Sequence, residues 1–212
     1  MVDAVTRRVE TIERDGKPAK VVVAIRTYPT GVEDLWDALT TIERIPRWFA
    51  PVTGDLRVGG RYQIEGNASG EVLSCDPPKR FEITWVYDGE VSWVTVELTG
   101  EPGDDEATLE LRHTAHPPEQ FWDQFGPGAV GVGWDLSLLG LAVHVDSGQA
   151  VDPAAVEAWS ISPEGKAFVV AASQGWGEAA IADGDDPETA QRRAATAGSF
   201  YSGELPGPDA DG

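Results

Sequence analysis

The sequence predicts an α+β fold: an antiparallel sheet, one long apolar helix after it, and a helical C-terminal segment. The sheet is predicted because turn residues recur about every ten positions between Pro51 and Gly100, a spacing typical of antiparallel strands. The long helix is predicted because residues 130–145 repeat apolar side chains at helical spacing. Beyond Gly148 the composition changes to alanine and acidic residues, and two helices that begin with proline are expected there.

The first elements along the chain are two strands and a helix. Residues 5–13 and 20–28 have strand patterns, and the Asp-Gly pair within residues 14–17 is typical of a tight hairpin turn. Thr30-Gly31-Val32-Glu33 has the spacing of a capping box, which predicts that a helix begins there. Its buried face is expected to hold Val32, Leu35, Trp36 and Leu39.

The strands over residues 80–87 and 107–114 alternate between apolar and polar side chains, so each is expected to have one dry face and one wet face. The residues expected on the dry faces are Phe81, Ile83, Trp85, Tyr87, Ala107, Leu109, Leu111 and His113. Residues 91–99 are less clear, because Trp93 lies in the row opposite Val94, and the orientation of that strand stays open.

The long helix over residues 130–145 carries two apolar stripes and is therefore expected to be covered on two sides. The sheet covers one side, and the C-terminal segment is the candidate for the other. Helices are expected over residues 163–182 and 187–201, docked through Phe168, Trp176 and Phe200. These observations predict a compact domain (1–148), a helical extension packed on it (149–203) and a disordered tail (204–212).

The charge balance excludes several classes of partner. Lys and Arg number 16 against 36 Asp and Glu, so the formal net charge is −20, which disfavours nucleic acid and anionic membrane surfaces. The single cysteine, Cys75, excludes an intramolecular disulfide and fits a reducing compartment. The N-terminal residues contain no apolar signal core, so we expect a soluble, cytoplasmic protein.

A series of motifs resembles the START-like (SRPBCC, helix-grip) superfamily, and within it the branch similar to the C-terminal domain of the activator of Hsp90 ATPase. The motifs follow the family's order over residues 20–145. They are Tyr28-Pro29-Thr30, Ile45-Pro46-Arg47-Trp48-Phe49, Asp55-Leu56-Arg57-Val58-Gly59-Gly60-Arg61-Tyr62, Cys75-Asp76-Pro77-Pro78-Lys79-Arg80-Phe81, Thr108-Leu109-Glu110-Leu111-Arg112-His113 and Gly133-Trp134. The resemblance implies a curved antiparallel sheet that grips the long helix and encloses a cavity, which in many relatives holds a hydrophobic small molecule. The extension beyond residue 148 departs from the usual compact domain, and it is expected either to cap the cavity or to form a dimer contact.

Aromatic side chains are the candidates for a ligand site. A short helical piece over residues 42–45 is expected to end before Pro46 and to turn Trp48 and Phe49 toward the rim of the sheet. Together with further residues they form a candidate apolar pocket of the kind that binds small molecules. The candidate ligand-binding residues are Trp48, Phe49, Tyr62, Trp85, His113, Trp134, Leu138 and Leu141. Each of these residues could instead be an ordinary core residue. His113 would either offer a hydrogen bond to a ligand in the apolar pocket or be a core histidine that is hydrogen-bonded within the protein.

Other chemistry finds little support in the sequence. His113 and His116 lack a third ligand, so no metal site is expected. Residues 126–131 match G-x-G-x-x-G, but they follow an expected loop over residues 121–124 and not a strand, so no dinucleotide cofactor is expected. No nucleophile motif is present, and Cys75 has no evident histidine partner.

The leading functional prediction is therefore the binding of a hydrophobic or aromatic small molecule without catalysis and without a cofactor. The first alternative is a protein-interaction module resembling the Hsp90 activator, with a chaperone as partner and a role in stress response. The second alternative is a cyclase or hydrolase that uses the same cavity. A homodimer is an alternative explanation for the second apolar side of the long helix.

Overall fold

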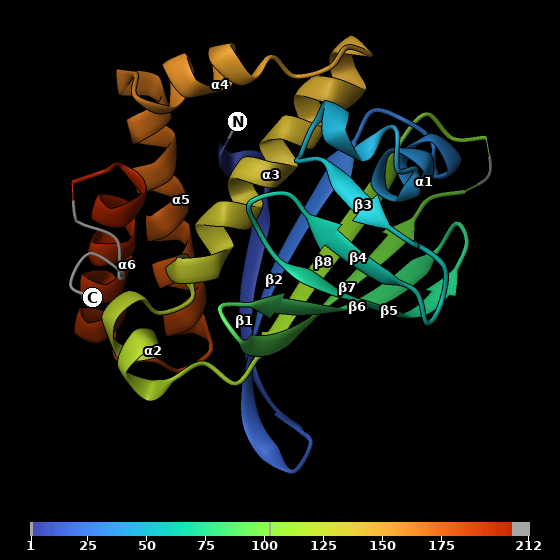
Figure 1. The fold of residues 1–212 in the computed structure, drawn as a ribbon. Coiled ribbons are helices and arrows are strands. Elements are labelled where there is room, and N and C mark those ends of the chain that lie inside the picture. Colours follow the sequence, from blue (N-terminus) through green and yellow to red (C-terminus); the bar gives the residue numbers. More distant parts are fainter. Residues whose placement is uncertain (1, 102, 205–212) are drawn as a thin grey trace.

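The computed structural model describes residues 2–101 and 103–204. An eight-stranded antiparallel sheet, in the order β1-β2-β8-β7-β6-β5-β4-β3, curves around a long helix, α3 (Gly128–Ser147), as Figure 1 shows. This is the predicted α+β helix-grip fold. The strands are β1 (Thr6–Arg14), β2 (Lys17–Tyr28), β3 (Val52–Gly54), β4 (Arg61–Ile64), β5 (Ser69–Asp76), β6 (Arg80–Tyr87), β7 (Glu90–Thr99) and β8 (Ala107–Ala115).

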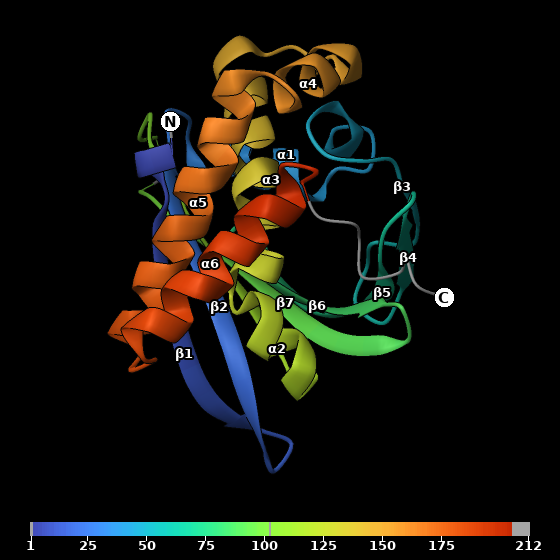
Figure 2. The same cartoon turned by 90° about the vertical axis from the view of Figure 1, so that its left-hand side faces the viewer.

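The other helices cover α3 and the end of the sheet. They are the 3₁₀ helices η1 (Val2–Ala4) and η2 (Ile45–Arg47), and the α-helices α1 (Val32–Thr40), α2 (Glu119–Phe125), α4 (Pro153–Ser160), α5 (Pro163–Ala182) and α6 (Pro187–Tyr201). In Figure 2, α5 and α6 lie side by side in front of α3. Helix α5 also packs on β1, so the C-terminal segment covers the second side of α3.

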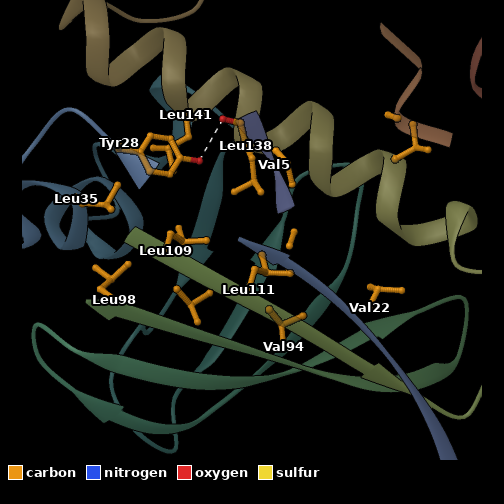
Figure 3. Close-up of a cluster of buried hydrophobic side chains, with 14 of the residues drawn as sticks. Val5, Val22, Tyr28, Leu35, Val94, Leu98, Leu109, Leu111, Leu138 and Leu141 are labelled. Atoms are coloured by element: carbon orange, nitrogen blue, oxygen red, sulfur yellow. Dashed lines mark hydrogen bonds between the residues drawn. The ribbon is translucent and has the colours of Figure 1, made fainter. Parts of the chain in front are cut away.

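The hydrophobic core lies between α3, α5, α1 and the inner face of the sheet. Figure 3 shows Leu138 and Leu141 of α3 pointing toward Tyr28 and the valines and leucines of the central strands. The Tyr28 hydroxyl donates to the Leu138 carbonyl at 3.2 Å, which satisfies a polar atom in an apolar setting. Full burial of each such side chain stabilises the fold by about 2 kcal/mol.

A buried ion pair joins three elements that are distant in sequence. Asp135 of α3 is fully buried and accepts two hydrogen bonds from Arg7 of β1, at 2.8 and 3.1 Å. Trp176 of α5 donates its indole N–H to the same carboxylate at 2.7 Å. Burial raises the pKa of Asp135, and the bonds from Arg7 and Trp176 oppose that shift. The C-terminal helices are thus bonded to α3 by both apolar and polar contacts.

Helix α3 is long and apolar enough to cross a membrane by length and composition alone. In the structure it packs on β2, α5 and α6, and its Asp135 and His144 are buried within protein. His144 accepts from Arg44 at 3.3 Å and pairs with the Gln149 carbonyl at 2.6 Å. These surroundings are those of a core helix.

Several local predictions are confirmed. The β1–β2 turn places Asp15 and Gly16 at positive φ, as a two-residue hairpin turn requires. The helices predicted over residues 163–182 and 187–201 have those bounds, and Ser162 and Asp186 cap them by accepting from the Gly165 and Thr189 amides. The side chains predicted on the dry face of β8 also point into the core, with Leu109, Leu111 and His113 buried.

Helix α1 begins at Val32, where the capping-box spacing predicted a helix start, but two details near it are wrong. No side chain caps α1: Thr30 donates to Asp34 at 2.8 Å, and Gly31 occupies the N-cap position. A side chain at Gly31 would meet the Asp104 carbonyl at 2.9 Å, so a close tertiary contact determines this residue. The short helical piece was expected to end before Pro46, but Pro46 lies inside η2, because the first turn of a helix tolerates a residue without N–H.

Two further predictions are wrong, and a third concerns residues that lie mostly outside the described part of the chain. The expected loop over residues 121–124 belongs to α2, whose Phe125 is buried. Tyr87, expected on a dry face, is 58% exposed because it lies where β6 turns into β7. The tail predicted over residues 204–212 lies, from residue 205 on, outside the described residues.

Candidate functional site

A cavity of about 150 Å³ lies between the curled strands β3 to β8, the end of α1, η2 and the first half of α3. Among the described residues that line it, none has a charged side chain. Exposed Cys75 of β5 marks its rim. The lining residues are Leu39, Thr40, Ile45, Trp48, Phe49, Val52, Leu56, Tyr62, Ile64, Val72, Cys75, Phe81, Ile83, Trp85, Val94, Val96, Leu111 and Trp134.

Strand alternation on β6 builds the floor of this cavity. Phe81, Ile83 and Trp85 occupy every second position and therefore point to the same face. All three are only half-buried although they lie on the inner face of the sheet. Their accessible surface faces the cavity, which they line together. The sequence thus places a row of three large apolar side chains along the cavity.

Helix η2 supplies the opposite wall. Trp48 follows η2 and donates its indole N–H to the Ala38 carbonyl at 2.8 Å, which fixes its ring, and Phe49 packs beside it at 5.4 Å between ring centroids. The approach of η2 to α3 depends on Gly140, where a side chain would meet the Trp48 carbonyl oxygen at 2.6 Å. The aromatic pair therefore has a fixed position relative to α3.

The polar atoms of the lining side chains are mostly bonded within the protein. The Tyr62 hydroxyl donates to the Thr84 carbonyl at 2.6 Å, and Thr40 donates to the Trp36 carbonyl at 2.8 Å. Burial, followed by the nearby charge of Asp76, raises the pKa of the Cys75 thiol, so its thiolate is disfavoured. The cavity consequently presents mainly carbon to a bound molecule.

Trp134 lines the cavity from α3 and is held by a chain of hydrogen bonds. Its indole N–H donates to His113 Nδ1 at 3.0 Å, and His113 Nε2 bonds the Ser92 hydroxyl at 2.7 Å. Because Nδ1 accepts, the neutral ring carries its proton on Nε2 and donates to Ser92, which in turn donates to the Trp85 carbonyl at 3.0 Å. Burial lowers the pKa of His113 to about 4, so the chain is intact at neutral pH.

A second, smaller cavity of about 30 Å³ lies on the other side of His113. Its walls come from β2, β8, α2 and the start of α3, and they are mostly apolar. The charged residue among its described lining residues is Lys20, whose ammonium donates to Thr11 at 2.9 Å and lies 5.2 Å from the centroid of the Trp122 ring. His113 therefore lines the small cavity and is separated from the large cavity by Trp134, to which it is hydrogen-bonded.

Of the predicted site residues, the structure brings five together around the large cavity: Trp48, Phe49, Tyr62, Trp85 and Trp134. His113 lies behind Trp134 and bonds it. Leu138 and Leu141 point into the core beside Tyr28 (Figure 3). Most of the lining residues from α1 and from β3 to β5 were not predicted as part of the site. The alternation of Tyr62 with Ile64 along β4 could have indicated that both side chains point to the same face.

Metal-binding side chains do not gather in the part of the chain that the structure describes: no group of three or more His, Cys, Asp or Glu is arranged to hold an ion. His113 bonds Ser92 and Trp134, and His116 bonds the Pro18 carbonyl at 2.8 Å. These histidines have separate roles in the fold.

Comparison with known proteins adds a family and a set of similar structures. The family described as "Activator of Hsp90 ATPase homolog 1-like protein" matches residues 29–146. The crystal structure of CalU16 from Micromonospora echinospora is 30% identical, with 86% of this chain and 99% of that chain covered and a TM-score of 0.64. Its solution NMR structure is similar over 95% and 94% of the two chains, at 27% identity and the same TM-score.

The similarity to CalU16 extends into the C-terminal helices, since it covers most of both chains. Protein MLL2253 from Mesorhizobium loti, 26% identical with a TM-score of 0.53, covers 60% of this chain and 97% of its own. No curated protein matches the chain.

Proposed function

The chain belongs to the Activator of Hsp90 ATPase homolog 1-like family, and on that basis we propose that its large cavity binds one uncharged, ring-sized apolar group without a catalytic step. The observation that carries this proposal is a cavity of about 150 Å³ walled by aromatic and aliphatic side chains. In another protein, an apolar cavity of roughly this size stays dry and binds benzene. A single aromatic ring, or the ring-sized end of a longer molecule, therefore fits the volume.

The aromatic lining favours a planar ring over an aliphatic group. Trp85 and Trp134 meet edge to face, with ring centroids 5.2 Å apart, and Trp48 and Phe49 stand across from them. Aromatic pairs gain about 1 kcal/mol beyond the burial of their area, so a ligand ring gains from each ring that it contacts. These side chains support the choice of an aromatic ligand class.

The charge of the ligand follows from the lining. A charged group would lose its hydration on entering the cavity and would find no charged partner among the described lining residues. Tyr62, Thr40, Trp48 and Trp134 already use their donors within the protein. We therefore propose a neutral ligand, and we propose binding alone because the lining offers no evident acid, base or activated nucleophile.

Calorimetric titration tests the proposal. Toluene should bind saturably with one site, whereas benzoate and benzylammonium, which add a charge to the same ring, should bind at least tenfold more weakly. Trp48→Ala and Trp85→Ala should each weaken toluene binding about fivefold to tenfold, because each removes an aromatic wall. No saturable binding of toluene to folded protein would overturn the proposal.

The matched control is Trp93→Ala. Trp93 is also a half-buried tryptophan of the sheet, but it lies under Arg14, whose guanidinium carbon is 4.0 Å from the ring centroid, and it lines neither cavity. This variant should bind toluene like the unaltered protein. If Trp93→Ala weakens binding as much as Trp85→Ala, the effect is general and the cavity is not the site.

A second candidate function, a protein-interaction module, is favoured by the family and by the net charge of −20, which suits a basic partner surface. Its partner would be a chaperone of the Hsp90 type. The test is the ATPase rate of the host's own Hsp90 with and without the full chain. An unchanged rate at saturating protein concentration would count against this function and would leave ligand binding unaffected.

A further inference from the structure

A tryptophan and a histidine that are hydrogen-bonded to each other connect the linings of the two cavities. Trp134 of α3 lines the large cavity, and His113 of β8 lines the small one. A hydrogen bond of 3.0 Å joins the two side chains. The bonded pair thus separates the large cavity, on the Trp134 side, from the mostly apolar small cavity on the His113 side.

We infer that Trp134 and His113 form a partition that sets the depth of the ligand cavity, and thereby limits the ligand to one ring with a short inward substituent. This inference rests on the proposed function, because it concerns the length of the ligand that the same cavity accepts. His113 acts here as a positioning residue: it holds the Trp134 ring across the cavity and need not touch the ligand.

The partition is held in place because His113, which accepts from Trp134, is itself bonded on its other ring nitrogen. His113 is fixed by Ser92 at 2.7 Å, and Ser92 by the Trp85 carbonyl at 3.0 Å. The rings of Trp85 and His113 also pack against each other, with centroids 6.0 Å apart. Rotation of Trp134 out of the cavity would break its bond to His113 and leave a buried acceptor unpaired, which is unfavourable.

The space behind the partition is apolar enough to receive a hydrocarbon. Val22, Phe121, Trp122 and Val130 are among its walls, and its charged member, Lys20, is held by Thr11 at 2.9 Å and by Asp183 at 3.8 Å. Removal of the Trp134 indole would join this space to the large cavity. An alkyl chain attached to a bound ring would then extend inward and not into water.

A series of n-alkylbenzenes, from toluene to hexylbenzene, tests the inference by calorimetry. Each buried CH₂ raises affinity about fourfold, so affinity rises along a series for as long as the chain finds apolar space. In the unaltered protein the rise should stop after the first one or two carbons. In Trp134→Ala, and in Trp134→Leu as a less disruptive change, the rise should continue for at least two carbons more.

The control variants separate the partition from general loosening of the cavity. Val130→Ala enlarges the small cavity but leaves Trp134 and His113 in place, so the rise should stop where it does in the unaltered protein. Trp93→Ala, which removes a tryptophan away from both cavities, should also leave the series unchanged. Ser92→Ala, which is not a control, should move the limit to longer alkyl chains by loosening His113, and an unchanged limit would count against the positioning role of His113.

The outcomes distinguish the inference from the proposed function. If folded Trp134→Leu binds toluene but its affinity stops rising at the same chain length as the unaltered protein, the partition is overturned and the proposed function stands. If neither protein binds toluene, the proposed function fails and the inference fails with it. An unaltered protein whose affinity rises steadily up to hexylbenzene also overturns the partition.

Discussion

At the scale of single residues, Asp135 has the largest structural effect that we expect from one side chain. It is fully buried and pairs with Arg7, whose side chain is 9% exposed. Asp135→Asn should lower the free energy of unfolding by about 3–5 kcal/mol, because it leaves the Arg7 guanidinium buried without a charged partner. Urea denaturation measures this change.

The control for this substitution is a surface ion pair on the same sheet. Glu110 bonds Arg8 and Arg112 on partly exposed sites, at 3.1 and 3.2 Å. Glu110→Gln should cost only about 0–1 kcal/mol, since exposed pairs contribute little. Equal losses for the two variants would contradict a special role for Asp135.

His113 should make folding sensitive to acid. Its pKa is about 4 in the folded protein and near 6.5 in an unfolded chain, so between these values the unfolded state binds more protons. Stability from this group is full above about pH 6.5 and falls as the pH drops toward 4, by on the order of 3 kcal/mol. His113→Gln should flatten this part of the pH dependence of the unfolding free energy; an unchanged slope would contradict the assignment.

The sequence predicts some of these residues and not others. Strand alternation places His113 on the dry face of β8, because a period of two is a local property of the chain. Its partners Ser92 and Trp134 are 21 residues away on either side, and only the sheet register and the docking of α3 bring them together. Asp135 interrupts the apolar run over residues 128–145, and an isolated acid there is a signal for a buried partner.

At the scale of elements, the glycines of α3 allow the C-terminal helices to approach closely. A side chain at Gly131 would lie 2.2 Å from the Trp176 indole, whereas one at Gly133 would lie 3.1 Å from the Tyr201 hydroxyl, a contact that a small shift relieves. Alanine normally stabilises a helix interior by about 1 kcal/mol relative to glycine. Gly131→Ala should instead destabilise the protein by roughly 2 kcal/mol or more, by displacing Trp176.

Gly133→Ala is the matched control and should change the free energy of unfolding by less than about 1 kcal/mol in either direction. Thermal denaturation followed by circular dichroism compares the two variants. A Gly131→Ala protein as stable as Gly133→Ala would show that the close contact with Trp176 contributes little.

The start of a helix was predicted correctly where its capping residue directly precedes the helix in sequence. Ser162 and Asp186 each accept from an amide three residues later. Neighbouring residues alone therefore determine where α5 and α6 begin. Asp152 caps α4 in a similar way before Pro153, a signal that was overlooked. The capping box predicted from Thr30 does not form: Thr30 donates to Asp34, and Gly31, whose side chain would meet the Asp104 carbonyl, occupies the N-cap position.

At the scale of the whole molecule, the C-terminal helices and the sheet share one core. Phe168, Val169 and Trp176 of α5 pack in the same cluster as Val5, Val9 and Leu138. We therefore predict that the full chain unfolds in a single cooperative transition. A truncated chain, residues 1–150, should lack a cooperative transition, because it exposes the faces of α3 and β1 that α5 covers.

Differential scanning calorimetry of the full and truncated chains checks this prediction. A truncated chain with its own sharp transition would show that residues 1–148 form a separate folding unit. The sequence predicted the extension and its docking residues, but it could not predict how far the core is shared. Two apolar stripes on one helix are equally well covered by a second copy of the chain.

The location of the bound ring in the large cavity is tested by a crystal structure of the protein with iodobenzene. Iodine scatters anomalously, so its position is unambiguous even at partial occupancy. We predict one iodine site between Phe81, Trp85 and Trp134, in the cavity of about 150 Å³. Iodobenzene bound elsewhere, with ordered water filling this cavity, would contradict it.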